Sequence, residues 1–390
     1  MSHLTDLTSQ CIRCGFCLES CPTFQETGEE TESPRGRIYL VRSAEEGKIA
    51  WEDAQEHLDL CLGCRACETA CPSAVKYGEI LELARDRLEN HRGFSAKRTL
   101  LNVLSNPGKL RRQLSLAKCI PGRRVPTMVS KLLSGQPPEA DRPVLPSKVQ
   151  FPPLIGSKLP PLRGEVAVLE GCAMRVLYPH VNEITRRLLR RVGYEAREFK
   201  QECCGALHAH NGNLDTAKST RDQLFNAIPQ GLPLIVNSAG CGSWLRDAVG
   251  DRKVFDASEF LLDQGLAGLL AEEGRLESIV TYHDACHLAH GQGIRKEPRD
   301  LLKAIPGVQL VELAEADTCC GSAGIYNILQ PRMARRLLER KWASIERAGA
   351  TIAVTGNPGC HAWIFQAAQE HGKRVEVLHT LEVLERALSN

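Results

Sequence analysis

Eight cysteines near the start of the sequence follow one spacing that occurs twice. The pattern Cys-x-x-Cys-x-x-Cys-x-x-x-Cys-Pro runs from Cys11 to Pro22 and again from Cys61 to Pro72. Three cysteines at this spacing can bind three corners of one cubane iron-sulfur cluster, while the fourth leaves along the chain and faces the other cluster. We therefore assign two crossed ligand sets for two 4Fe-4S clusters: Cys11, Cys14, Cys17 and Cys71 for the first, and Cys61, Cys64, Cys67 and Cys21 for the second.

The crossed ligands require the two clusters to lie close together, which predicts a short path for single electrons. Zinc is the alternative, because thiolate pairs also bind tetrahedral zinc. Zinc sites use paired Cys-x-x-Cys knuckles, however, and zinc does not explain why the four-cysteine run occurs twice. Gly15 and Gly63 would let backbone N–H groups approach the sulfur atoms, whereas Arg13 and Arg65 either place positive charge near a cluster or are simply solvated.

A second group of eight cysteines follows residue 170 and forms two matching sets. Equivalent cysteines of the two sets are separated by 114 to 119 residues, and the apolar runs beside them match as well. Short apolar runs alternate with helix-like stretches, which predicts two tandem α/β lobes, each with a Cys-Cys-Gly (CCG) loop. The sets are Cys172, Cys203, Cys204 and Cys241, and then Cys286, Cys319, Cys320 and Cys360.

The first and last cysteines of each set follow a predicted strand, where open α/β sheets bind their ligands. Each set could hold a further iron-sulfur cluster or a zinc ion, or could consist of buried structural thiols. Nearby imidazoles could be ligands or proton carriers, but we favour ordinary loop residues for His208, His210, His283, His287 and His290. Cys119 lies outside every motif, and we expect a packed or surface thiol there.

Length and composition predict a soluble, folded protein of several domains, and the helical cysteine domain together with the two α/β lobes makes the expected fold class α+β. The 390 residues exceed the roughly 100–200 of one domain. The net charge of +2 gives no reason to expect a nucleic-acid partner. The 17 cysteines, the absence of a signal-like start and the lack of a long apolar run predict a reducing, cytoplasmic setting. We expect a helical two-cluster domain at 1–95, a basic linker at 96–162, and CCG lobes at 163–275 and 276–390.

The segment 96–150 carries eleven Lys or Arg against two acidic residues. Its cations alternate with apolar residues, and such a pattern can lie on an anionic leaflet, with each cation worth about 1 kcal/mol. A solvated helical face or a docking surface for a partner subunit explains the pattern equally well. Pro107-Gly108 should break any long helix in this segment.

The chain resembles the iron-sulfur subunit of bacterial glycolate oxidase. The resemblance rests on Cys-Gly-Phe-Cys at 14–17, Cys-Pro-Thr-Phe at 21–24, Pro-Arg-Gly-Arg-Ile-Tyr-Leu at 34–40 and the run from His57 to Ser73. We expect the arginines of the third motif to pack near a cluster.

Both repeats are similar to the cysteine-rich domains of heterodisulfide reductases, the anaerobic glycerol-3-phosphate dehydrogenase and lactate-utilisation proteins. In the reductase pattern each repeat ends in Cys-x-x-Cys. Here Trp244 and Trp363 occupy the position of the last cysteine, and the missing thiols count against a non-cubane catalytic cluster.

The resemblance implies an electron-transfer subunit that is not catalytic alone. Separate subunits carrying FAD would oxidise glycolate to glyoxylate, and this chain would pass the electrons to membrane quinone or another acceptor, at the inner face of the cell membrane. The sequence contains neither a complete dinucleotide fingerprint nor a P-loop, so we expect the flavin on a partner. The alternatives are the equivalent subunit of a glycerol-3-phosphate or lactate dehydrogenase, an iron-sulfur redox sensor, and a self-sufficient catalyst that uses clusters in the CCG lobes.

Overall fold

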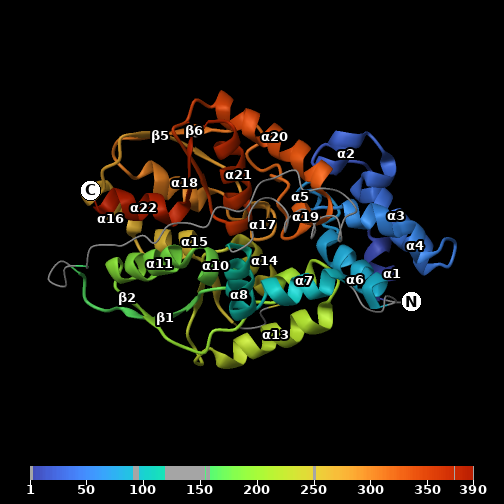
Figure 1. The fold of residues 1–390 in the computed structure, drawn as a ribbon, viewed down its shortest axis with the longest axis horizontal. Helices are drawn as coiled ribbons and strands as arrows, with labels where there is room; N and C mark the ends of the chain where they lie inside the picture. The colour runs from blue at the N-terminus through green and yellow to red at the C-terminus, as the bar shows by residue number, and fades with distance from the viewer. Residues whose placement is uncertain are drawn as a thin grey trace.

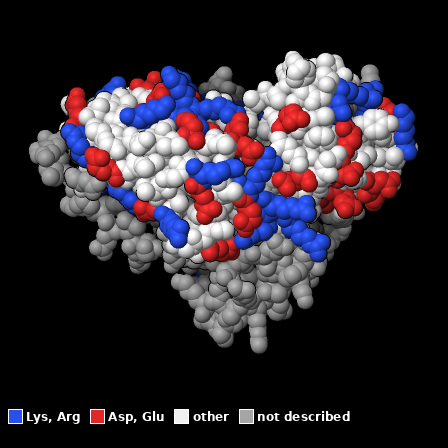
Figure 2. Space-filling model, turned by 90° about the horizontal axis from the view of Figure 1, so that it is seen from above, with Lys and Arg blue, Asp and Glu red and all other residues white. Residues whose placement is uncertain are grey.

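The computed structural model describes residues 3–90, 96–118, 154, 159–248, 252–372 and 374–389. A helical N-terminal domain lies at one end of the molecule, and two α/β lobes make up the rest (Figure 1). None of the helices in these residues is both long and apolar enough to cross a bilayer. Figure 2 shows that basic and acidic side chains are interspersed over the face it presents.

The N-terminal domain is entirely helical, as the sequence predicts. Its apolar residues, including Val41, Ala54 and Leu58, form a small core to which Cys61 and Cys67 also belong. Ser33 caps the third α-helix by accepting a hydrogen bond from Gly36 N, so this helix begins directly after a turn. The elements are α1 (His3–Ser9), α2 (Pro22–Thr27), η1 (Glu30–Glu32), α3 (Pro34–Glu45), α4 (Trp51–Leu60), α5 (Ala66–Thr69) and α6 (Tyr77–Asn90).

The described part of the expected linker forms two helices, α7 (Ala96–Leu104) and α8 (Pro107–Lys118), which are interrupted where Pro107-Gly108 predicts a break. Leu101 and Leu110 are buried, whereas Lys109, Arg111 and Arg112 are exposed. Leu101 and Leu110 therefore pack against the protein, and Lys109, Arg111 and Arg112 face outward. Lys97 instead pairs with Glu89 of α6 at 3.1 Å.

The first lobe contains a four-stranded parallel sheet in the order β2-β1-β3-β4. Its buried strands are short apolar runs, as is usual for parallel strands covered by helices. Helix α8 packs against the first helix of this lobe. The elements are β1 (Gly164–Leu169), α10 (Cys172–Leu177), α11 (Pro179–Arg191), β2 (Tyr194–Arg197), α12 (Ala206–Ala209), α13 (Leu214–Ala227), β3 (Leu234–Val236), α14 (Ala239–Arg246), β4 (Val254–Asp256), α15 (Ala257–Asp263) and α16 (Leu266–Glu273).

The second lobe repeats this arrangement with a parallel sheet in the equivalent order β6-β5-β7-β8. The match in strand order and direction confirms the internal duplication. The elements are β5 (Ser278–Tyr282), α17 (Cys286–Ala289), α18 (Lys296–Lys303), β6 (Val308–Glu312), α19 (Tyr326–Leu329), α20 (Pro331–Arg347), β7 (Ile352–Thr355), α21 (Pro358–Glu370), β8 (Glu376–His379) and α22 (Thr380–Ser389).

The two lobes share a hydrophobic core, which the sequence did not reveal. Helices α11 and α15 of the first lobe pack against α22 and α18 of the second. Val181, Leu261, Leu301 and Leu384, one from each helix, are completely buried in this core. The lobes are therefore repeats in sequence that pack on each other through a common core, while the first lobe also has a core of its own that includes Leu224 and Val236.

An ion pair buried in this shared interface joins α11 to α22. Arg187 lies 2.6 Å from the Glu385 carboxylate, and Arg191 approaches the same carboxylate at 3.5 Å. We predict that Glu385→Ala lowers the free energy of unfolding by about 3–5 kcal/mol, because buried guanidinium charge loses its partner. Anaerobic denaturant titration measures the change.

Glu376→Ala is the matched control. Glu376 pairs with Arg386 of α22 at 2.7 Å, but about half of its side chain is exposed. Its loss should cost less than about 1 kcal/mol. Equal losses for the two variants would contradict a structural role for the buried pair.

Candidate iron-sulfur sites

The two cysteine runs of the N-terminal domain adopt the same loop conformation. In each run the second and fourth residues after the first cysteine have positive φ: Arg13 (59°) and Gly15 (90°), and then Gly63 (64°) and Arg65 (64°). Such turns orient successive backbone N–H groups into a concave, anion-binding surface, and Gly63 N donates to Cys61 Sγ at 3.4 Å. A Cβ at position 15 would lie 2.7 Å from Arg35 Nη1, so this guanidinium would have to shift to admit a side chain.

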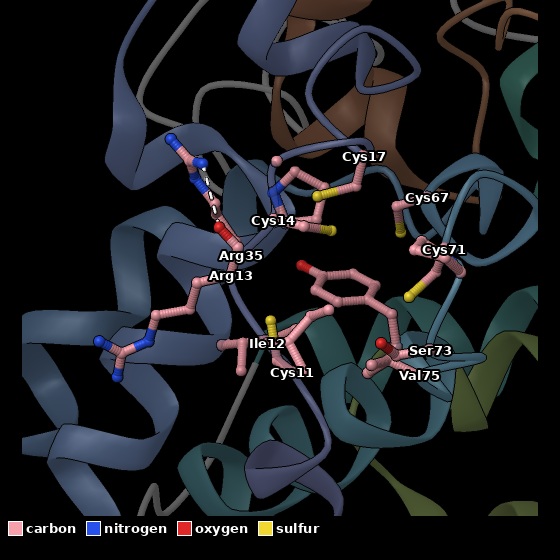
Figure 3. Close-up of a pocket in the computed structure, with 15 residues that line it drawn as sticks. Cys11, Ile12, Arg13, Cys14, Cys17, Arg35, Cys67, Cys71, Ser73 and Val75 are labelled. Atoms are coloured by element: carbon pink, nitrogen blue, oxygen red, sulfur yellow. Dashed lines mark hydrogen bonds between the residues drawn. The ribbon is translucent and has the colours of Figure 1, made fainter.

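The first cavity is lined by three cysteines of the first run together with the last cysteine of the second run. Figure 3 shows Cys11, Cys14, Cys17 and Cys71 around this cavity, with Cys67 also at its edge. The cysteines of residues 11–17 are exposed or half-buried, and Cys14 is the exposed one. This site therefore lies at the surface of the domain.

The second cavity has the reciprocal composition and lies deeper. It is lined by Cys21 from the first run and by Cys61, Cys64 and Cys67 from the second, all of them buried. Cys67 and Tyr77 line both cavities, so the two cavities are adjacent. The fold thus brings together the residues of each crossed set predicted from the sequence.

The chemistry of these donors fits iron-sulfur clusters. Burial raises the pKa of Cys17 to about 11 and raises the pKa of Cys64 and Cys67 well above the usual thiol value. Thiols in such places do not ionise without a compensating cation, and metal binding would displace their protons. Two adjacent groups of four soft donors fit two thiolate-bound cubanes, one in each cavity.

A buried arginine supplies positive charge beside the second cavity. Arg37 is 1% exposed, and its Nη1 lies 4.0 Å from Cys21 Sγ. The guanidinium is held by Glu32 at 2.6 Å and by the carbonyl oxygen of His57 at 2.7 Å. Arg35 approaches the other loop, donating to the carbonyl oxygen of Arg13 at 3.4 Å (Figure 3). Both arginines of residues 34–40 thus lie beside the cysteine loops.

Two further residues at the second site were missed by sequence reasoning. Tyr77 donates to Cys61 Sγ at 3.5 Å, and Arg85 Nη2 donates to the carbonyl oxygens of Leu58 and Cys61. Both lie on α6, where they occupy ordinary positions of an amphipathic helix. No sequence pattern distinguishes them from core or surface residues, because their roles depend on a loop more than ten residues away.

In the first lobe the four CCG-set cysteines converge at the carboxyl ends of the strands. Cys172 begins α10 directly after β1, Cys241 lies in α14 after β3, and the CCG loop follows β2. The Cys172 and Cys203 sulfur atoms are 3.6 Å apart, and those of Cys204 and Cys241 are 3.0 Å apart. This is the point where the strand order reverses, the usual ligand position in such sheets.

In the second lobe the corresponding cysteines lie against the N-terminal domain. Cys286, Cys319, Cys320 and Cys360 are all buried and share a core with Leu62 and Cys64. Hydrogen bonds across this boundary join Tyr326 to the Leu60 carbonyl oxygen at 2.8 Å and His287 to the Gly63 carbonyl oxygen at 2.9 Å. The second CCG set thus packs against the loop that carries Cys64.

The histidines near the CCG cysteines fall into two kinds. His208 pairs with Ser105 at 3.0 Å, His210 with Glu82 at 2.7 Å, and His290 with Thr69 at 2.9 Å. Together with His287 they join elements distant in sequence, as expected for structural residues. His283 differs, because its ring lies with Cys320 and Cys360. Cys119 lies outside the described residues.

The arginines predicted to lie near the clusters have distinct surroundings. Arg13 is exposed and its guanidinium lies 5.0 Å from the centre of the Tyr39 ring. Arg65 instead bridges the N-terminal domain to the first lobe, contacting Asp247 at 2.5 Å and Ser243 at 3.1 Å. Simple solvation therefore does not describe Arg65.

We predict that Arg37→Met destabilises the fold by about 3–5 kcal/mol, because Glu32 is left buried without its cation. It should also lower the midpoint potential of the centre bound by Cys21, since positive charge is lost beside that sulfur. Denaturant titration and potentiometric EPR measure these effects.

Arg35→Met is the control. Its side chain is 30% exposed and that of its partner Glu30 is 51% exposed, so we expect a loss below about 1 kcal/mol. Identical behaviour of the two variants would refute the assignment.

Comparison with known proteins agrees with this arrangement. Residues 8–75 match the 4Fe-4S dicluster domain family, and residues 166–246 and 280–365 each match the cysteine-rich domain family. The probable glycolate oxidase iron-sulfur subunit of Bacillus subtilis is 36% identical over 96% of this chain and 92% of its own length. The glycolate oxidase iron-sulfur subunit of Escherichia coli is 34% identical over 97% and 93%.

A more distant relative shares part of the chain. Lactate utilization protein A of Oceanobacillus iheyensis is 27% identical over 56% of this chain and 96% of its own length. The two glycolate oxidase relatives, each more than 30% identical over nearly the whole chain, decide the assignment: the protein belongs to the family of glycolate oxidase iron-sulfur subunits.

Proposed function

We propose that this chain is the electron-transfer subunit of a glycolate-oxidising complex. Flavin-bearing partner subunits would oxidise glycolate to glyoxylate, and this chain would carry the electrons away one at a time. The observation that best supports the proposal is the pair of adjacent cavities, each lined by the four cysteines of one crossed set, with Cys67 and Tyr77 lining both. When bound, 4Fe-4S clusters supply one-electron carriers.

The residues of the chain would perform three tasks in this relay. The crossed cysteines hold the first centre, bound by Cys11, Cys14, Cys17 and Cys71, beside the second, bound by Cys61, Cys64, Cys67 and Cys21. Arg37 holds positive charge next to Cys21. Tyr77, which is 4% exposed, fills space between the cavities and helps to exclude water. These roles need no proton transfer and no substrate site on this chain.

We propose that electrons enter at the first centre. Cys14 is exposed there, and large apolar side chains surround it: Ile12 and Phe16 are 68% and 70% exposed, and Tyr39 is 52% exposed. Apolar and aromatic side chains beside an exposed ligand suit docking of the flavin-bearing subunit, which must bring its flavin near this edge. The second centre is buried behind it and suits onward transfer.

Removing one ligand from either centre tests the relay. We expect Cys14→Ser and Cys64→Ser to leave reduction of the partner flavin by glycolate intact while abolishing electron transfer to an added acceptor, because one carrier in the series is lost. Rapid-scan absorbance of the flavin in the purified complex gives both rates. Cys119→Ser, a cysteine outside every motif, should behave as wild type. Normal acceptor reduction by either ligand variant would exclude the relay.

The apolar edge gives a separate test of docking. Phe16→Glu places a charge in the proposed contact and should weaken copurification of the flavin-bearing subunit at least tenfold, because a buried interfacial charge without a partner is costly. Iron content should not change. Leu162→Glu is the control, because this side chain is also apolar and is 59% exposed but lies outside the N-terminal domain, and copurification should not change. Copurification unchanged by Phe16→Glu would place the partner elsewhere.

The substrate follows from the family relation and is a proposal for this chain. Its partial relatives include a lactate utilization protein, so lactate is the second candidate. Screening glycolate, lactate and glycerol 3-phosphate with the copurified flavin subunit separates these substrates. The framework of eight N-terminal cysteines is compatible with each of them.

We propose a cytoplasmic position at the inner face of the membrane, with quinone or another acceptor downstream. Arg111 and Arg112 are exposed on α8, whereas the neighbouring Leu110 is buried, so contact of these three residues with lipid would be electrostatic. Neutralising Arg111, Arg112, Arg123 and Arg124 should shift the complex from the membrane to the soluble fraction. The last two lie outside the described residues. Unchanged partition in low-salt flotation would exclude this contact.

A further inference from the structure

The second lobe contains a buried nitrogen donor that the relay does not use. His283 follows β5 directly and is 1% exposed. Its Nδ1 lies 3.2 Å from the carbonyl oxygen of Ala316, whereas its Nε2 is buried without a hydrogen-bond partner among the described residues. A carbonyl partner on one ring nitrogen selects the tautomer that leaves the other nitrogen free to bind metal, as is usual for metal-binding histidines.

This histidine points into the CCG cysteine set. A ring nitrogen of His283 and the sulfur atoms of Cys320 and Cys360 all lie within 4.8 Å of one another. Cys286 and Cys319 complete the set, since the Cys286 and Cys319 thiols are hydrogen-bonded and Cys319 precedes Cys320. One ring nitrogen and four thiols therefore belong to the same buried group, in which His283, Cys320 and Cys360 are mutually close. The position three residues after Cys360 is Trp363, so no fifth thiol is available there.

A buried cation accompanies this donor set. Lys341 on α20 is 3% exposed. It lies close enough to Cys319 and Cys320 for an electrostatic interaction with their thiolates. Its ammonium hydrogen-bonds to the carbonyl oxygens of Glu315 and Ala316. A buried ammonium is stable beside an anionic group, which a thiolate-bound metal centre would provide.

The first lobe has neither feature at the equivalent positions. The residue three positions before Cys172 is Leu169, which is 1% exposed, and the equivalent of Lys341 counted from the CCG loop is Phe225. Apolar side chains thus replace the nitrogen donor and the cation. The two repeats share four cysteines each but differ in what surrounds them.

We propose that the second lobe binds an iron-sulfur centre through Cys286, Cys319, Cys320 and Cys360, with His283 as its nitrogen ligand. Five donors exceed the four of a structural zinc site. The set packs against Cys64 of the second N-terminal centre in a shared core, so the site would extend the chain of carriers into the second lobe. A nitrogen ligand raises the potential of an iron-sulfur cluster relative to all-thiolate ligation, which suits an acceptor in this position. The inference goes beyond the proposed relay.

The test uses the full chain purified without oxygen and labelled with 15N-histidine. We expect a histidine nitrogen coupling in pulsed EPR of the reduced protein. His283→Leu, which reproduces the residue of the first lobe, should remove this coupling together with the iron of the second lobe while both N-terminal signals remain. His283→Cys should retain that iron but lose the coupling. His290→Gln, whose ring nitrogens are hydrogen-bonded to Thr69 and to the carbonyl oxygen of Asp317, should change neither.

Three results would overturn the proposal. They are a nitrogen coupling that persists in His283→Cys, an iron content unchanged in His283→Leu, and zinc rather than iron in the second lobe by elemental analysis. The His283→Cys protein keeps the test valid if the leucine variant fails to fold. None of these readouts requires glycolate or the flavin-bearing subunit, so failure of the relay and failure of this site are distinguishable.

Discussion

The fourth cysteine of each N-terminal run lies at the cavity of the other run, and this exchange constrains the rest of the domain. Cys21 and Cys71 can reach their cavities only if the two loops face each other. The chain between the loops must therefore fold back on itself, which α2, α3 and α4 accomplish. The buried network of Arg37, Glu32 and the His57 carbonyl oxygen joins these segments at the same place. Each cavity therefore has its full set of four cysteines only when the two loops face each other.

The same constraint gives the domain an outer and an inner side. Cys14, Ile12 and Phe16 are exposed on the outer side, whereas the loop carrying Cys64 faces the lobes. Contacts from that loop and from α6 secure the inner side: Arg65 pairs with Asp247, and Arg85 donates to the carbonyl oxygen of His210 at 2.7 Å. In the proposed relay, the direction of electron transfer thus follows from burial, because one centre lies at the surface and the other against a packed interior.

The repeated lobes show how duplication can be kept in the fold while the sites diverge. Both sheets have the same strand order, and both place cysteines at the carboxyl ends of the strands. Leu169 and Phe225 in one lobe stand where His283 and Lys341 stand in the other. A shared core between α11, α15, α18 and α22 holds both lobes in one body, so one lobe could change its chemistry without losing its packing.

The sequence predicted much of this arrangement wherever the information was local. The spacing of Cys11 to Cys21 and of Cys61 to Cys71 indicated the helical domain and the crossed sets, and the repeat predicted two similar parallel sheets. It did not predict the shared core, the role of Arg85 or the environment of His283. These depend on contacts between residues tens to hundreds of positions apart, such as Arg187 with Glu385, and a single sequence carries no periodic signal for them.

Iron counting in combined cysteine variants tests the crossed ligand sets most directly. In a chain carrying Cys11→Ala and Cys14→Ala the first cluster is lost, and anaerobic iron and sulfide analysis should fall by roughly four irons, one cubane. Adding Cys71→Ala should then change nothing, whereas adding Cys21→Ala should remove roughly four more irons with the second cluster. The reverse result, loss with Cys71→Ala and none with Cys21→Ala, would show that each run binds its own cluster and would contradict the account.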